Sequence, residues 1–357
     1  MDHGFQPAPE NLALKNLATT VLMTLFILAL GLWPVVTAEA RQAAGSQIPD
    51  DTAIEQVVRE AYERFKEDKS GKNADYIRAL ASVDPDIFGI TVVTADGRIF
   101  EAGDTGAAVS IQSISKVFTA SLVMQERGDG FIRERIGANA TGLPFNSIMA
   151  IELHGGSASN PFVNAGAIQA TSWVAARDSS ERWARIKANM DAYAGRHLSF
   201  NEEVFKSELN DNKRNQAIAK LLDAYGRMGS DPLEAVTVYT RQCSVNVTSR
   251  DLAVMGACLA NHGVNPVTGR RLLKQEYVPR LLALMATAGL YDNAGDWLFA
   301  TGAPAKSGVG GGLLVVIPGK LAIGTVSPPL DRFGNSVRGQ KASIYIIEKL
   351  GLNPLAQ

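Results

Sequence analysis

The sequence predicts an α+β fold in which two β-hairpins from opposite ends of the chain form one antiparallel sheet around a large helical insert. The first hairpin pattern comprises residues 88–94 and 98–102 around an Asp-Gly turn, and the second comprises 313–317 and 321–326 around Pro-Gly. Short apolar runs separated by such dipeptides are typical of paired strands. Between the hairpins, residues 113–288 show mainly helical periodicity interrupted at glycines.

Helices are expected before, between and after these strands. Thr52, with Glu55 three positions later, predicts the N-cap of a helix whose apolar residues over 54–65 repeat at helical spacing. A terminal helix over 337–350 is expected to pack on the sheet. Helices of the insert are expected to stop near Gly128, Gly229, Gly263 and Gly289.

The N-terminal region differs in composition from the rest of the chain. Residues 17–36 carry no charge and are numerous enough to cross a bilayer. A small-x-small cleavage pattern follows at Ala38-Glu39-Ala40, although the preceding residues lack the basic segment of a typical signal peptide. We therefore predict a signal peptide or membrane anchor over 1–45 and one domain over 46–357. The protein is expected to be exported or anchored on the periplasmic side rather than cytoplasmic.

Composition argues against several classes of function. The formal net charge is −1 with basic and acidic residues intermixed, so nucleic-acid binding is not expected. The four histidines are scattered and no cysteine pair has metal-ligand spacing, so neither a metal nor another cofactor is expected. Cys243 and Cys258 are expected to be buried thiols.

The strongest chemical signal is Ser113-Ile114-Ser115-Lys116. A serine and a lysine three positions apart share one face of a helical turn, so the amine can take the proton of the hydroxyl. The start of a helix also supplies an unpaired N–H that can stabilise an oxyanion. To act near neutral pH the lysine should be buried with a second cation, such as Lys306, close by. By itself the motif is also compatible with a capped surface helix.

A second motif, Lys306-Ser307-Gly308, is followed by Val309 and three glycines. We interpret it as a strand with bare backbone against which a substrate can lie, although glycines can also serve packing. The pairing of S-x-x-K with K-S-G is found in β-lactamases and penicillin-binding proteins. No S-D-N motif occurs, and the nearest substitute, Ser244-Val245-Asn246, comes late in the chain for a loop facing the same pocket.

Longer blocks of the sequence resemble the serine-dependent glutaminases from about residue 50 to the C-terminus. These blocks include 112–116, 160–168, 243–245, 265–269 and 304–312, in the order of that family. The resemblance implies a β-lactamase/DD-peptidase-like fold and cofactor-free hydrolysis of L-glutamine to L-glutamate and ammonia through a glutamyl-serine intermediate. It also implies a homo-oligomer, a tetramer or a dimer.

The resemblance further assigns roles to individual residues. Ser113 would be the nucleophile and Lys116 its base, with the N–H groups of Ser113 and Val309 binding the oxyanion. Tyr76 and Tyr291 would lie at the reacting amide, where a tyrosine can relay a proton to the departing ammonia. An α-amino acid requires a carboxylate for its ammonium and neutral donors for its carboxylate. The residues implied for that end of the substrate are Asn164, Glu208, Asn215 and Tyr239.

Two other functions remain open from the sequence. An exported β-lactamase or penicillin-binding-type acyl-serine enzyme would share both short motifs, but the missing S-D-N does not support it. A membrane-anchored ligand sensor would use the same pocket to bind without turnover, and would form an acyl group that is not released.

Overall fold

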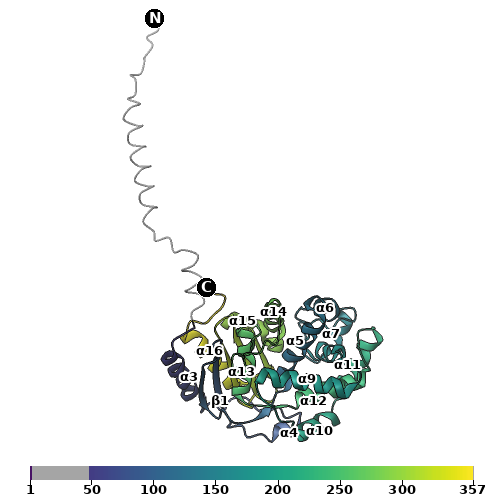
Figure 1. Cartoon of the computed structure of the whole chain (residues 1–357), viewed down its shortest axis with the longest axis horizontal. Helices are drawn as coiled ribbons and strands as arrows, with labels where there is room; N and C mark the ends of the chain where they lie inside the picture. Colours follow the sequence, from purple (N-terminus) through teal and green to yellow (C-terminus); the bar gives the residue numbers. More distant parts are fainter. Residues whose placement is uncertain (2–47, 357) are drawn as a thin grey trace. The chain divides into compact units, whose positions relative to one another are not determined.

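The two predicted hairpins join into one antiparallel sheet, as expected from the sequence (Figure 1). The computed structural model describes Met1 and residues 48–356. In spatial order, the strands of the sheet are β2 (Ile99–Gly103), β1 (Gly89–Thr94), β7 (Leu321–Val326), β6 (Gly312–Ile317) and β5 (Ala305–Gly308). β1 pairs with β7 with Gly89 opposite Val326, so the hairpins from the two ends of the chain are directly hydrogen-bonded.

Helices surround this sheet, and most of the insert between the two hairpins is helical. Outside the insert lie α3 (Asp51–Phe65), α4 (Arg78–Ala81) and the terminal α16 (Val337–Lys349). The first part of the insert contains β3 (Val109–Ser110), η1 (Gln112–Ile114), α5 (Ser115–Arg127), α6 (Asp129–Arg135), α7 (Ile148–Leu153), α8 (Asn164–Trp173) and α9 (Ser179–Ala194). The second part contains α10 (Glu202–Asn210), α11 (Lys213–Ala224), α12 (Pro232–Cys243), β4 (Asn246–Val247), α13 (Ser249–Ala260), η2 (Gln275–Tyr277), α14 (Val278–Ala288), η3 (Tyr291–Asn293) and α15 (Ala294–Thr301).

Three of the four predicted helix stops lie at or near a helix end, but Gly229 does not, because α11 already ends at Ala224, and the predicted N-cap of α3 is also wrong. Gly128 and Gly289 are the C-caps of α5 and α14. The N-cap of α3 is Asp50 rather than Thr52, because the Asp50 carboxylate accepts a hydrogen bond from the Thr52 N–H at 2.9 Å. Aspartate caps a helix at least as well as threonine, so the helix begins earlier than the Thr-Glu pattern suggests.

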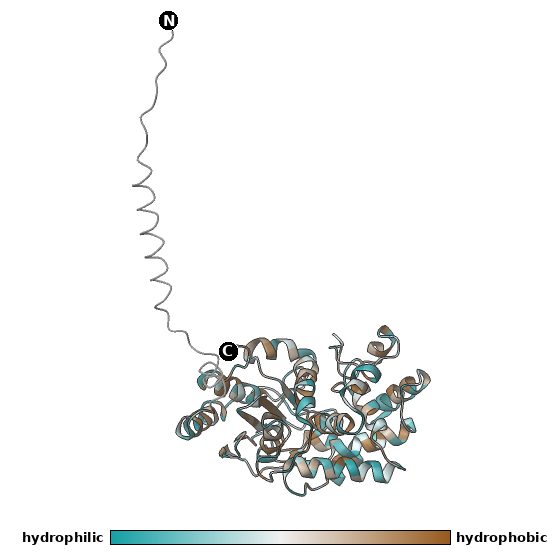
Figure 2. Cartoon of the chain, turned by 45° about the horizontal axis from the view of Figure 1, so that its top comes forward, coloured by the Kyte–Doolittle hydropathy of each residue, from teal (hydrophilic) through white to brown (hydrophobic). Residues whose placement is uncertain are grey.

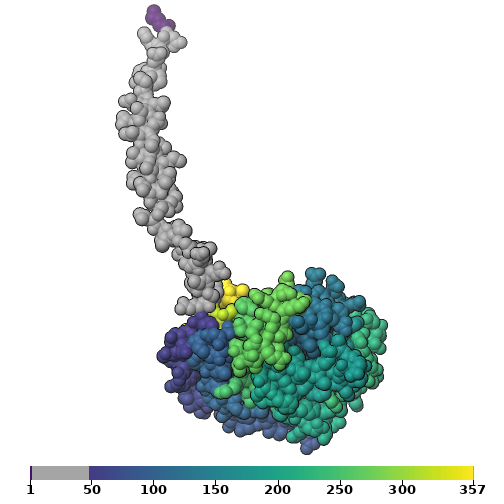
Figure 3. All heavy atoms as spheres, viewed as in Figure 1, coloured from purple at the N-terminus to yellow at the C-terminus, as the bar shows by residue number. Residues whose placement is uncertain are grey.

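The side chains of β6 alternate between two apolar cores. Residues 313, 315 and 317 pack with α3 and α16, whereas 314 and 316 pack with helices of the insert. Figure 2 shows the strands as a brown, apolar layer among the helices. In the space-filling view, the green part of the chain around α14 and α15 lies between the purple and blue N-terminal part and the teal helices (Figure 3). The sheet is therefore covered on both faces.

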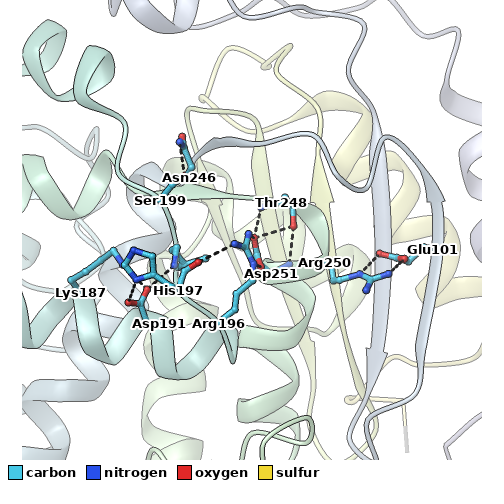
Figure 4. Close-up of polar contacts among 11 residues, drawn as sticks. Glu101, Lys187, Asp191, Arg196, His197, Ser199, Asn246, Thr248, Arg250 and Asp251 are labelled. Carbon is cyan, nitrogen blue, oxygen red and sulfur yellow. Dashed lines mark hydrogen bonds and ion pairs between the residues drawn. The ribbon is translucent and has the colours of Figure 1, made fainter.

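Helix α13 lies close against the sheet because β7 contains a glycine at the crossing point. A Cβ atom at Gly324 would lie 2.3 Å from the carbonyl oxygen of Ser249, the first residue of α13. Charged side chains then fix α13 to its neighbours (Figure 4). Arg196, just after α9, bonds the Asp251 carboxylate, and Arg250 bonds Glu101 of β2. These contacts join the helical insert to the edge of the sheet.

The apolar run over 17–36 lies outside the described residues, so the signal peptide or anchor over 1–45 stays a prediction. Among residues 48–356, none of the helices combines the length and the apolar character that a membrane span requires.

Candidate active site

Ser113 lies in η1, directly before α5, at the wall of a cavity of about 580 Å³. The residue before it, Gln112, has a φ of 50°, a left-handed conformation that costs energy in a residue with a side chain. The Gln112 amide donates hydrogen bonds to Ser110 Oγ at 3.1 Å and to Glu208 Oε1 at 2.6 Å. These contacts hold the turn that presents Ser113 to the cavity.

Lys116 lies in the first turn of α5 and is 1% exposed. Burial disfavours its ammonium form and lowers its pKa to about 7, against a smaller opposing effect of Cys243. The nearby Lys306 is also buried, and its pKa is lowered by burial and by the charge of Lys116. Lys116 Nζ donates to Asn164 Oδ1 at 2.7 Å, and within residues 48–356 no hydrogen bond joins it to Ser113. The amine can therefore be neutral near pH 7.

Asn164, the first residue of α8, connects Lys116 to the rest of the site. Its Oδ1 accepts hydrogen bonds from Lys116 Nζ and, at 3.1 Å, from the Tyr239 hydroxyl of α12. Its Nδ2 donates to Asn215 Oδ1 of α11 at 3.1 Å. The amide of Asn164 thus links α8 to side chains of three other helices around the same cavity.

Glu208 and Tyr76 also line this cavity. Burial raises the pKa of the Glu208 carboxyl to about 7, partly offset by its hydrogen bond from Gln112. Much of the Tyr76 surface is exposed, but its phenol lies at the cavity, where burial and the charge of Glu208 raise its pKa to about 12. A cationic ligand beside Glu208 would restore the carboxylate form.

Tyr291 is buried beside the cavity and has a φ of 56°. Its ring lies 4.6 Å from that of Phe145, between centroids, and its hydroxyl donates to the Ser307 carbonyl at 3.4 Å. Burial raises the pKa of its phenol, an effect that the nearby Ser113 hydroxyl opposes. The proton of Tyr291 is therefore firmly held at neutral pH and lies close to Ser113.

Val309 follows β5 and lines the cavity. Its N–H donates to no other group in the described part of the chain, so it can bind an oxyanion. The predicted strand is present at Lys306-Ser307-Gly308, which belong to β5, but it does not continue through the glycines, because residues 309–311 form a turn and Gly312 begins β6. A Cβ at Gly310 would lie 2.3 Å from the Ser110 carbonyl oxygen. The bare backbone at Gly310 therefore allows contact with the segment before Ser113, rather than with a substrate.

The segment 244–246 lies nearer the site than its place in the sequence suggests. Asn246 of β4 pairs with Ser110 of β3, three residues before Ser113. However, the Ser244 hydroxyl donates to the Thr240 carbonyl of its own helix, and the Asn246 side chain bonds Ser199. Neither residue lines the cavity, so this segment does not replace S-D-N.

The predicted site residues therefore come together at one cavity. Those that line it are Tyr76, Ser113, Asn164, Glu208, Asn215, Tyr239 and Val309, and Lys116 and Tyr291 are buried beside it. Sequence reasoning missed the roles of Gln112, Phe145 and the loop 331–334, which also line the cavity. For Gln112, the position directly before the S-x-x-K motif is the sequence feature that could have indicated a role in the site.

The two cysteines are free and buried, as predicted. Cys243 also lines the cavity, where burial raises the pKa of its thiol to about 12 and makes it a poor nucleophile. Within residues 48–356, no three His, Cys, Asp or Glu side chains are grouped as metal ligands would be.

Comparison with known proteins gives one consistent result. The sequence model of the family described as glutaminase matches residues 71–354. A glutaminase from Colwellia psychrerythraea is 50% identical over 305 residues, covering 85% of this chain and 98% of the relative. One from Brucella canis is 52% identical over 283 residues, covering 79% and 89%. The solved structure of a probable glutaminase, ybaS, has a TM-score of 0.84 and 45% identity, covering 85% of this chain and 99% of that one. A probable glutaminase from Bacillus subtilis has a TM-score of 0.77 and 29% identity, covering 85% and 97%.

Proposed function

This chain belongs to the glutaminase family, and we propose that Ser113 is the nucleophile of its reaction. As a glutaminase, the protein hydrolyses L-glutamine to L-glutamate and ammonia. The observation that carries the proposal is the position of Ser113 at the cavity wall, with Lys116 buried one turn away and its pKa lowered to about 7.

We assign the binding of the amino-acid end of glutamine to the polar wall of the cavity. The Glu208 carboxylate binds the α-ammonium, which returns the buried carboxyl to its charged form. Asn215 and Tyr239, which meet at Asn164, lie where they can donate to the α-carboxylate. This arrangement orients the side-chain amide of glutamine toward Ser113.

Acylation then proceeds in two proton-coupled steps. Neutral Lys116 takes the hydroxyl proton of Ser113 as Oγ attacks the amide carbon, and the N–H groups of Ser113 and Val309 stabilise the resulting oxyanion. The carbon–nitrogen bond breaks as Tyr291 gives its proton to the leaving nitrogen and takes up the proton that Lys116 had received from Ser113. This step releases ammonia, restores the Tyr291 phenol and returns Lys116 to its neutral form. Water, activated by the same base, then hydrolyses the glutamyl ester to glutamate and regenerates Ser113.

The direct test is Ser113→Ala, which removes a single oxygen. We expect ammonia release to fall by several orders of magnitude while the fold is retained, because groups of this kind act as a unit. Ser121→Ala is a matched control, since Ser121 is a buried serine of α5 whose hydroxyl bonds the Phe118 carbonyl and which does not line the cavity. Near-normal turnover in Ser113→Ala would exclude this serine as the nucleophile.

The fold we propose is β-lactamase/DD-peptidase-like. The support is the position of S-x-x-K at the start of α5, beside K-S-G on the edge strand β5 of an antiparallel sheet. Family membership nevertheless favours glutamine over a β-lactam, and hydrolysis over ligand sensing. Release of glutamate from a transient acyl-enzyme, followed by mass spectrometry, separates turnover from the irreversible acylation of a sensor.

Assembly and location are further proposals. The family resemblance supports a homo-oligomer, a tetramer or a dimer, which light scattering on the purified protein tests. The uncharged run over 17–36 supports export or anchoring on the periplasmic side. Cell fractionation tests this, and an intact N-terminus on soluble cytosolic enzyme would contradict it.

A further inference from the structure

The conformation of Tyr291 requires support from its surroundings. Its φ of 56° is a left-handed value that a residue with a side chain adopts only when neighbouring contacts enforce it. The ring is held by Phe145 and by Lys306, whose Nζ lies 4.1 Å from the ring centroid. These contacts position the ring, but they do not fix the peptide group that precedes Tyr291.

The Asn335 side chain contacts that peptide group. Asn335 Nδ2 donates to the carbonyl oxygen of Leu290 at 3.4 Å, and this carbonyl belongs to the peptide bond that enters Tyr291. On its other side, Asn335 Oδ1 accepts a hydrogen bond from Ser307 Oγ at 2.6 Å. Ser307 lies two residues before Val309, and its carbonyl accepts from the Tyr291 hydroxyl. One amide therefore connects the entry to Tyr291 with the strand that ends at the oxyanion site.

The backbone of Asn335 fixes a third segment. Its N–H donates to Asp331 Oδ1 at 3.0 Å, and its carbonyl accepts from the Asp331 N–H at 2.8 Å. The loop 331–334 that these bonds close lines the cavity. A Cβ at Gly334 would lie 3.5 Å from Val309 and 3.8 Å from the Tyr291 ring. Asn335 itself is 0% exposed, so water does not compete for its hydrogen bonds.

From this geometry we infer that Asn335 is a positioning residue for Tyr291, acting through Leu290 and Ser307. The inference rests on the proposed function, in which Tyr291 relays a proton. The Leu290 carbonyl also accepts a hydrogen bond from the Asn293 N–H at 3.1 Å, so loss of the Asn335 amide removes one of its two bonds. The same loss frees Ser307, whose carbonyl accepts from the Tyr291 hydroxyl, and together these changes displace the phenol from the leaving nitrogen. Small displacements of a reacting group reduce turnover strongly, while substrate affinity depends on other walls of the cavity.

The test measures kcat and KM for ammonia release by the full-length enzyme. We expect Asn335→Ala to lower kcat by about tenfold to 100-fold with KM changed by less than about threefold. Ser307→Ala, which removes only the donor to Asn335 Oδ1, should lower kcat in the same direction by less. If Asn335→Ala does not fold, the kinetics of Ser307→Ala test the inference in its place. In a Tyr291→Phe background, both substitutions should have little further effect, because the group they position is already lost.

Asn265→Ala is the matched structural control. Asn265 is equally buried and bonds backbone groups of α9 and of its own loop, but it does not line the cavity. Thermal stability should fall in this control without a comparable loss of kcat.

The inference is overturned if kcat of the double variant Asn335→Ala/Tyr291→Phe falls by the product of the two single losses. It is also overturned if Asn265→Ala, at an equal loss of thermal stability, lowers kcat as much as Asn335→Ala does. Failure of the proposed function looks different. In that case Ser113→Ala retains turnover, or Tyr291→Phe alone leaves kcat unchanged, and the latter also removes the basis of this inference.

Discussion

Two buried groups of the cavity must be deprotonated before the free enzyme can bind and attack glutamine. Lys116 must be neutral to act as a base, and Glu208 must be charged to bind the α-ammonium. Burial brings both groups to a pKa of about 7, lowering it for the amine and raising it for the carboxyl. The acid side of the pH profile of kcat/KM should therefore depend on two protons rather than one.

The magnitude follows from the two pKa values. Between pH 8 and pH 6, the deprotonated fraction of a group with a pKa of 7 falls about tenfold, so two such groups lower kcat/KM about 100-fold. In the enzyme–substrate complex, the ammonium of glutamine lowers the pKa of Glu208 and leaves Lys116 alone to titrate. Over the same range, kcat should therefore fall only about tenfold.

The assay is initial-rate ammonia release at a series of glutamine concentrations and pH values, with circular dichroism at each pH to confirm folding. In Glu208→Gln, binding weakens and the acid limb of log kcat/KM should have a slope of one instead of two. A slope of one in the unmodified enzyme would refute the reasoning, and so would a slope of two that persists in Glu208→Gln.

Three further substitutions test other parts of the structure. Tyr291→Phe should lower kcat by roughly 10² to 10⁴-fold with little change in KM, measured by steady-state kinetics, because the phenol is lost as a proton relay. Gly310→Ala should lower kcat/KM at least about tenfold, because the added Cβ would lie 2.3 Å from the Ser110 carbonyl oxygen and displace the turn at the oxyanion site. Arg338→Met should lower the free energy of unfolding by about 3 kcal/mol or more in chemical denaturation, because carbonyl groups of the segment 85–87 lose their buried donor.

Each of these substitutions has a matched control. Tyr345→Phe removes a hydroxyl that bonds Glu60 outside the cavity, and should leave kcat unchanged. At Gly295 an added Cβ would meet no atom within 4 Å other than the backbone of its own helix and its chain neighbours, so Gly295→Ala should leave activity intact. Arg59→Met removes an exposed ion pair and should change stability by less than about 1 kcal/mol. A test substitution that behaves like its control would contradict the corresponding argument.

The sheet could be predicted from the sequence because its signals are local. Alternating apolar residues with a turn dipeptide define each hairpin, and two hairpins most simply pair with each other. The position of Ser113 and Lys116 at the start of a helix follows from the same kind of pattern. The family resemblance then supplied the other site residues, which no periodicity indicates.

The remaining features depend on contacts between distant parts of the chain. Nothing around Asn335 in the sequence indicates that its amide contacts Leu290 and Ser307. The left-handed φ of Gln112 is imposed by its surroundings, since glutamine has no preference for it. Gly310 was assigned to substrate contact because its real neighbour, the backbone of Ser110, lies about 200 positions away in the chain.

The pairing of β1 with β7 also has a consequence for how the protein is made. The two strands are about 230 positions apart, so at 5–20 residues per second β1 waits roughly 10 to 50 s on the ribosome for its partner. During that time the central sheet cannot close, and apolar strand residues remain available to chaperones. The export that we propose requires an unfolded polypeptide in the translocation channel, and this delay would keep the chain in that state. Folding of the sheet is then completed only after the last strand has emerged.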